Sequence, residues 1–172
     1  MYRNARPEEF PLLQELEMEA GQRFAEFGMP EVSDSPPMLI KLLQECTEHG
    51  GVWVADIEDT IAGFIAFTKY TSYIHIDEIS VHTQFGRRGI ATEFLERLAQ
   101  WGTNQGMQGI TLSTFKDVPW NRPFYEKRGF VVLTPEQYPP YLDKKAEEEA
   151  SRGLYESQRV CMARFLPSPS QQ

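Results

Sequence analysis

The chain has little cysteine, no long apolar run and no excess of positive charge. Its 172 residues include two cysteines, Cys46 and Cys161, which lie far apart and form no Cys-x-x-Cys pair. We therefore expect two buried reduced thiols and no bound metal, with a catalytic thiol as the less favoured alternative. No apolar stretch reaches the roughly 18 residues of a membrane-spanning helix. The N-terminal Arg3, Arg6 and Glu8 do not resemble a signal peptide, so we expect a cytoplasmic protein without a membrane partner.

The balance of charge and the length narrow the class of protein further. A formal net charge of −8 argues against nucleic acid as a partner, because nucleic-acid binding normally needs a basic face. The length predicts a single domain over residues 1–166, with residues 167–172 as a disordered tail.

The segment 74–105 organises the rest of the chain. It begins with an apolar, β-branched run that predicts a buried strand, continues through a turn with two glycines and two arginines, and ends in apolar residues at helical spacing. The first turn of a helix presents unpaired N–H groups that can bind a phosphate, and the arginines favour an anion. A glycine-rich turn by itself could equally serve only to connect the strand to the helix.

The turn Val81-His82-Thr83-Gln84-Phe85-Gly86-Arg87-Arg88-Gly89-Ile90-Ala91 resembles the acyl-CoA pyrophosphate loop of the GNAT superfamily of N-acetyltransferases. Gly89 and Ala91 match the last two fixed positions of that loop. Gly86 stands where the family usually has Gln or Arg, and Thr83 where it often has Pro. The resemblance implies acetyl-CoA as co-substrate, bound mainly by backbone N–H groups. The implied binding residues are Ile79, Val81, Gly86, Arg87, Arg88, Gly89, Ile90, Ala91 and Thr92.

A second motif, residues 121–130, resembles the later family motif that ends in Phe-Tyr-Glu-x-x-Gly-Phe. The resemblance implies that Asn121 and Tyr125 contact the cofactor and that Tyr125 is the general acid that protonates the CoA sulfur. Asn121 precedes Tyr125 by four residues, whereas family members commonly carry the asparagine seven residues before the tyrosine, where this chain has Val118. Judged without the family, Tyr125 would be interpreted as a core aromatic.

The general base is predicted to be Glu78, whose carboxylate lies among apolar strand residues where its pKa could be raised. Asp77, His75, His82 and a water molecule are alternatives. Strand alternation places His75 and Asp77 on one face and Glu78 on the other, unless a bulge shifts them.

The acceptor is expected to be an amine, bound between the first two helices and the segment after Phe130. Carboxylates and aromatic rings together suit a cationic amine. The role of the acidic segment 143–149 stays open. The candidate wall residues are Glu26, Phe27, Met29, Asp34, Trp120, Tyr138 and Tyr141.

The predicted fold is mixed α/β (α+β) and GNAT-like: a mostly antiparallel sheet of about six to seven strands with a central parallel pair, flanked by about four helices. Ser33, Asp34 or Ser35 should cap the second helix, and Asp117 the short helix that contains Tyr125. The predicted strands are residues 2–5, 52–56, 61–70, 73–81, 110–115, 130–133 and 160–165, and the predicted helices start at Pro7, Met38, Ile90 and near Tyr125, with a solvated helix within 138–153.

Three functions fit the sequence to different degrees. The first is an acetyl-CoA-dependent N-acetyltransferase that acts on a primary amine of a small molecule, peptide or protein. The second is a catalytically inactive acyl-CoA-binding sensor or partner-binding module. The third, a different nucleotide-binding enzyme, is disfavoured because the turn lacks both Gly-Lys-Ser/Thr and the three-glycine fingerprint. Exposed strand edges make a homodimer plausible.

Overall fold

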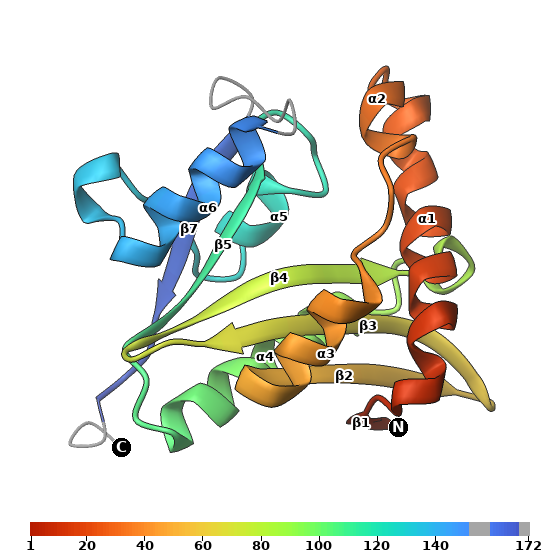
Figure 1. The fold of residues 1–172 in the computed structure, drawn as a ribbon, viewed down its shortest axis with the longest axis horizontal. Coiled ribbons are helices and arrows are strands. Elements are labelled where there is room, and N and C mark those ends of the chain that lie inside the picture. Colours follow the sequence, from red (N-terminus) through yellow and green to blue (C-terminus); the bar gives the residue numbers. More distant parts are fainter. Residues whose placement is uncertain (152–158, 169–172) are drawn as a thin grey trace. The chain divides into compact units, whose positions relative to one another are not determined.

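The computed structural model describes residues 1–151 and 159–168 (Figure 1). The sheet has seven strands in the order β1-β2-β3-β4-β5-β7-β6. The pairs β1–β2, β2–β3, β5–β7 and β6–β7 are antiparallel, and β4–β5 is parallel, which confirms the predicted fold class. The strands are β1 (Tyr2–Asn4), β2 (Gly50–Ile57), β3 (Thr60–Lys69), β4 (Tyr73–Val81), β5 (Gly109–Phe115), β6 (Val131–Val132) and β7 (Arg159–Phe165).

The helices add one element to the predicted set, α2, and the helix expected within residues 138–153 is α6. Short 3₁₀ turns lie at Pro7–Glu9, Thr83–Phe85 and Pro135–Gln137. The α-helices of the described residues are α1 (Phe10–Glu26), α2 (Pro30–Ser33), α3 (Ile40–His49), α4 (Ile90–Asn104), α5 (Arg122–Glu126) and α6 (Pro140–Ser151).

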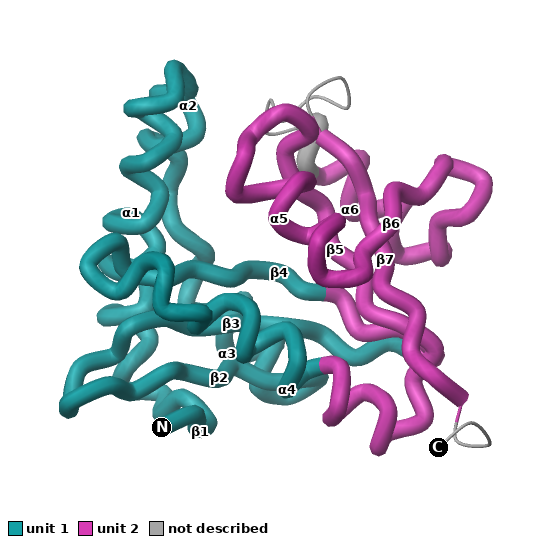
Figure 2. The backbone as a smooth tube through the Cα atoms, turned by 180° about the vertical axis from the view of Figure 1, so that it is seen from behind, with its two compact units in different colours: residues 1–70, 76–98 teal, residues 71–75, 99–172 magenta. Residues whose placement is uncertain are grey.

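The chain divides into two compact units, which Figure 2 distinguishes by colour. The first comprises residues 1–70 and 76–98, and the second residues 71–75 and 99–172. The boundary falls within β4, so that Tyr73–His75 belong to the second unit and the rest of the strand to the first. The single domain over residues 1–166 stays a prediction, and residues 169–172 of the predicted tail lie outside the described residues.

In the first unit, α1 and α3 cover one face of β2 and β3 (Figure 1). Alternate strand residues point toward the helices, and the helical residues that face them recur at intervals of three or four, as the sequence pattern predicts. Leu39 and Leu42 are exceptions to this pattern, because these apolar side chains are 60% and 40% exposed. The core cluster consists of Phe10, Leu13, Leu16, Leu43, Cys46, Val52, Val54, Phe64 and Ala66.

In the second unit, β5 and β7 pair along their whole length, from Gly109↔Phe165 to Phe115↔Arg159. The loop before α6 and α6 itself pack on this pair. Cys161 here and Cys46 in the first unit are both buried and form no disulfide within the described residues, as expected from the sequence. A small core consists of Leu133, Leu142, Cys161 and Ala163, with Tyr138 and Tyr141 packed against it.

Two predicted helix starts are wrong. The N-cap of α3 is Leu39, without a side-chain cap, and not Ser33, Asp34 or Ser35. Prolines 36 and 37 separate these polar residues from the helix, since a residue before proline disfavours helical backbone. Residues 30–33, predicted as loop, instead form the single turn α2. The N-cap of α5 is likewise Asn121 and not Asp117, because Pro119 intervenes.

Gly63 in β3 lets the end of β4 approach closely. A Cβ atom at Gly63 would lie 2.9 Å from the Ser80 carbonyl oxygen and 3.4 Å from Ile90 at the start of α4. We expect Gly63→Ala to lower the free energy of unfolding by about 1–3 kcal/mol through overpacking, measured by urea denaturation. Gly21→Ala in α1 is the matched control, because a Cβ there meets nothing within 4 Å and should stabilise the helix by roughly 0.5–1 kcal/mol. Equal stability of the Gly63 variant and the parent would contradict the argument.

Candidate functional site

A tight turn follows β4 and leads into α4; residues 82–91 are called the phosphate loop below. Its first part is fixed by its own hydrogen bonds. The Gln84 N–H donates to His82 Nδ1 at 3.1 Å, and the Gly86 N–H donates to the Thr83 carbonyl oxygen at 3.1 Å. Phe85 is 8% exposed and anchors the turn. The loop backbone is therefore held in one shape before any ligand binds.

The second part of the phosphate loop turns the chain and leads into α4. Arg87 and Gly89 have positive φ angles of 64° and 78°. The first hydrogen bond of α4 runs from the Glu93 N–H to the Gly89 carbonyl oxygen at 2.9 Å, so the N–H groups of Ile90 and Ala91 lie in the first turn, where a helix offers no acceptor. A Cβ at Gly89 would meet nothing within 4 Å, so the space beside it is open. This arrangement suits an anion.

Three arginines bring positive charge to the phosphate loop. The Arg88 guanidinium lies over the Phe85 ring, 5.1 Å from its centroid. Burial, and next the charge of Arg87, lower the pKa of Arg23 in α1, whereas Glu26 raises it. Arg87 and Arg88 were predicted from the sequence, but Arg23 was not.

Glu78, the predicted base, accepts a hydrogen bond from Ser80 Oγ at 3.0 Å. The charge of Glu78 acts on a second carboxyl group, Glu17 of α1. Burial, and next the charge of Glu78, raise the pKa of Glu17 to about 8, although a hydrogen bond from the Met38 N–H lowers it. That N–H lies 2.9 and 3.2 Å from the two carboxylate oxygens. Glu17 is therefore protonated in most molecules near neutral pH.

Glu17 was not among the residues predicted from the sequence, although the sequence carried a signal. It follows Leu13 by four residues and adjoins Leu16, both of which are buried on the inner face of α1. A carboxyl group within such an apolar stripe is costly to ionise. The helical periodicity could therefore have identified it.

The alternatives to Glu78 have other partners. Asp77 accepts hydrogen bonds from Thr68 Oγ1 at 2.7 Å and from the Cys46 thiol at 3.5 Å. His75 belongs to the second unit, is 3% exposed, and its Nδ1 lies 2.9 Å from Thr111 Oγ1. His82 caps the phosphate loop. Of the residues proposed as base from the sequence, Glu78 is the one whose charge raises the pKa of Glu17.

Tyr125 lies in α5 of the second unit and is 8% exposed. Its ring packs edge-on against Phe124 and Phe130, with centroids 5.2 and 5.6 Å away. Asn121 accepts hydrogen bonds from Thr114 Oγ1 and from the Phe115 N–H, the latter at 3.4 Å, through its side-chain oxygen. Asn121 thereby fastens the start of α5 to the end of β5, and α5 holds the Tyr125 ring in place.

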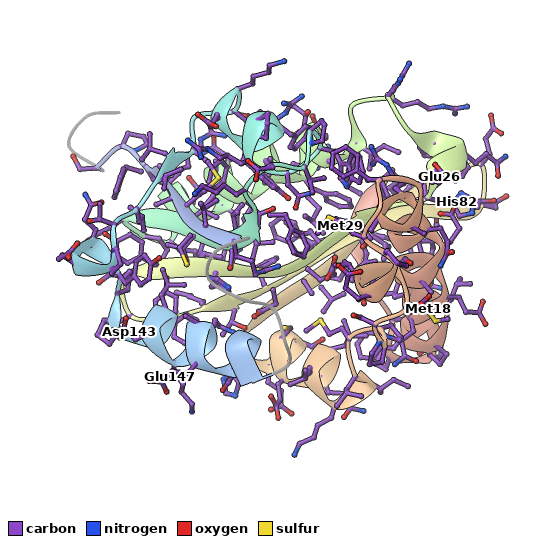
Figure 3. All side chains as sticks on the ribbon, turned by 90° about the horizontal axis from the view of Figure 1, so that it is seen from above. Met18, Glu26, Met29, His82, Asp143 and Glu147 are labelled. Carbon is purple, nitrogen blue, oxygen red and sulfur yellow. The ribbon has the colours of Figure 1, made fainter. Side chains whose placement is uncertain are left out.

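The predicted acceptor wall residues fall into both units. Glu26, Phe27, Met29 and Asp34 belong to the first; Figure 3 labels Glu26 and Met29 at the C-terminal end of α1 and the turn that follows. Trp120, Tyr138 and Tyr141 belong to the second, where the Tyr141 hydroxyl lies 2.7 Å from Thr111 Oγ1. Most of the acidic segment 143–149 is helical, and Asp143 and Glu147 are exposed on α6 (Figure 3).

The described residues hold neither a candidate membrane span nor a candidate metal site. None of the helices there is long and apolar enough to cross a membrane. Within the same residues, no group of three or more His, Cys, Asp or Glu side chains is arranged to hold a metal ion.

A family model described as Acetyltransferase (GNAT) family matches residues 12–130. Solved structures of similar fold include a GNAT-family acetyltransferase from Staphylococcus aureus, with 15% identity, a TM-score of 0.71 and coverage of 97% of this chain and 99% of that one. Ard1 from Thermoplasma volcanium has 17% identity and a TM-score of 0.68 over 98% of both chains. PaiA N-acetyltransferase from Thermoplasma acidophilum in complex with coenzyme A has 15% identity and a TM-score of 0.66, over 96% and 98% of the two chains.

Proposed function

Since the chain belongs to the acetyltransferase (GNAT) family, we propose that it transfers an acetyl group from acetyl-CoA to a primary amine of a small molecule, peptide or protein. The observation that carries the proposal is the phosphate loop, in which a rigid turn, a left-handed Gly89 and the first turn of α4 present N–H groups beside two arginines. Backbone N–H groups at a helix N-terminus bind phosphate well. The open space at Gly89 leaves room for the pyrophosphate of the cofactor.

The pantetheine arm is proposed to bind along β4. The parallel ladder between β4 and β5 runs from Tyr73↔Gly109 to His75↔Thr111, whereas β4 continues to Val81. Ile79 and Val81 lie beyond that ladder. Their backbone groups can therefore hydrogen-bond to an extended ligand, as unpaired strand edges do.

The amine must lose a proton before it attacks the thioester, because an ordinary primary amine is protonated near neutral pH. We assign this proton to the pair formed by Glu17 and Glu78. Below a pH of about 8, Glu17 is protonated and the pair carries one negative charge, which attracts the substrate ammonium. A general base works best when its pKa lies near the working pH. The pair can therefore accept the proton directly or through a water molecule.

The leaving thiolate must gain a proton, and Tyr125 is proposed as its donor. The phenol is buried and fixed between two aromatic rings, so its orientation costs little entropy when the substrate binds. Asn121 supports this arrangement through its hydrogen bonds to β5, besides the cofactor contact that the family resemblance implies.

The first experiment is a calorimetric titration of acetyl-CoA, with inorganic phosphate and ATP as comparison ligands. We expect selective binding of acetyl-CoA with a Kd of about 1–100 μM, in the lower part of the usual range of enzyme substrates. Gly89→Ala should weaken binding about tenfold by straining the loop. Gly28→Ala is the matched control, since Gly28 has a φ of 85° and nothing within 4 Å of its Cβ position. A folded protein that does not bind acetyl-CoA would refute the proposed function.

A further inference from the structure

Glu19 of α1, which is not part of the phosphate loop, forms hydrogen bonds to it. Its Oε2 accepts a hydrogen bond from the Thr83 N–H at 3.0 Å, and its Oε1 accepts one from Thr83 Oγ1. The same carboxylate lies 3.7 Å from His82 Nδ1. Figure 3 shows His82 beside the helix that carries Met18 and Glu26. The N–H and the hydroxyl group of Thr83 thus both donate to one side chain of α1.

This contact depends on the residue at position 83. A proline there has neither an N–H nor a hydroxyl group to donate. Thr83 supplies both, and it is the second residue of the turn whose hydrogen bonds shape the loop. The attachment of α1 to the phosphate loop is therefore encoded by Glu19 and Thr83 together.

Arg23 lies one helical turn after Glu19, so it extends from the same side of α1. The loop likewise continues from Thr83 to Arg87, and the charge of Arg87 acts on Arg23. Glu26, one turn further along α1, acts on Arg23 with the opposite sign. Two guanidinium groups from different elements repel each other, and an anion between them offsets that repulsion. A phosphate would turn that repulsion into attraction and would accept hydrogen bonds from both groups.

We propose that α1 forms a second wall of the cofactor-phosphate site, in which Glu19 positions the phosphate loop through Thr83 and Arg23 binds a phosphate of the cofactor together with Arg87. The inference rests on the proposed function, because it needs acetyl-CoA as the ligand. The phosphate that Arg23 contacts belongs to the pyrophosphate or is the 3′-phosphate of the adenosine ribose. In both cases anionic phosphate oxygens accept hydrogen bonds from the guanidinium group.

The test of Arg23 is calorimetry with acetyl-CoA and with its analogue that lacks the 3′-phosphate. Arg23→Gln should weaken binding of acetyl-CoA about tenfold, and the loss should shrink at high salt, where charge contacts are screened. If the loss persists with the dephospho analogue, Arg23 contacts the pyrophosphate; if it disappears, Arg23 contacts the 3′-phosphate. Arg6→Gln removes an exposed arginine elsewhere in the same unit and is the control.

The test of Glu19 compares two substitutions. Glu19→Ala should weaken acetyl-CoA binding about fivefold, because the Thr83 N–H loses its acceptor. Glu19→Gln keeps an acceptor oxygen and should restore most of the affinity, with an unchanged Tm. Glu15→Ala, which removes an exposed carboxylate one turn earlier on α1, is the control. Added to Glu19→Ala, Thr83→Val should cause little further loss, because both changes remove the same contact.

The outcomes separate the two proposals. If the parent binds acetyl-CoA and Arg23→Gln and Glu19→Ala bind it equally well, α1 has no part in the site and the inference is wrong, while the proposed function stands. If the parent itself does not bind acetyl-CoA, both proposals are wrong.

Discussion

Tyr125→Phe is expected to lower kcat about 100- to 1,000-fold while the Kd for acetyl-CoA stays within about twofold, since general acid catalysis typically contributes about 10²–10⁴-fold. The substitution removes one oxygen atom and keeps the ring that packs between Phe124 and Phe130. The fold and the cofactor affinity should therefore survive. The measurement is release of free CoA thiol under saturating acetyl-CoA, with an amine found by screening, together with calorimetry of each variant.

Tyr73→Phe is the matched control for this experiment. This substitution also removes one phenol oxygen, but at the start of β4. The Tyr73 ring packs against Gly109, with a ring atom 3.0 Å from the Cβ position of that glycine. Loss of the Tyr73 hydroxyl group should leave kcat unchanged. A Tyr125→Phe enzyme with full turnover would assign Tyr125 to packing alone. A parent protein that binds acetyl-CoA but acetylates no amine would instead favour the non-catalytic sensor.

Glu78→Gln and Glu17→Gln should change the rate and its pH dependence in different ways. Glu78→Gln should reduce kcat about 100-fold with a much smaller effect on the affinity for acetyl-CoA, because it removes the carboxylate that accepts the proton. In the parent, kcat/KM should rise as the pH approaches about 8, where Glu17 loses its proton. Glu17→Gln removes that titration, so the remaining pH dependence should be that of the amine.

The matched control is Glu15→Gln, an exposed carboxylate two residues before Glu17 on the same helix. Its activity and pH profile should equal those of the parent. The measurement is a series of rate profiles between about pH 6 and about pH 9.5, the range that brackets the raised pKa. Identical profiles for the parent and for both Gln variants would remove the carboxyl pair from the mechanism.

The same raised pKa predicts a change in stability. The pKa of Glu17 is higher in the folded chain than the ordinary value of 4.5. Protonated Glu17 therefore stabilises the fold fully below a pH of about 4.5, and this contribution is lost as the pH rises toward about 8. Above that range, the unfolding free energy of Glu17→Gln, which cannot ionise, should exceed that of the parent by about 5 kcal/mol. Thermal unfolding of both proteins across this pH range tests the sign.

The sequence by itself determined the strands, the longer helices and both motifs. The strand β4 was predicted with its observed bounds, because its apolar, β-branched residues lie between a polar turn and a glycine-rich turn. The start of α4 at Ile90 followed from Gly89, which adopts the left-handed backbone that such a turn needs. These features depend on neighbours within a few residues along the chain, so local patterns identify them.

The tertiary structure alone decided which side chains meet across the chain. Glu17 meets the Met38 N–H, 21 residues away, and Glu19 meets Thr83, 64 residues away. No periodicity or spacing specifies such contacts, because they depend on how α1 packs against the strands and on the loop that follows β4. Desolvation likewise needs the packed core, and desolvation is the main cause of the raised pKa of Glu17. The sequence thus located the cofactor motif, whereas packing set the charges and the supports around it.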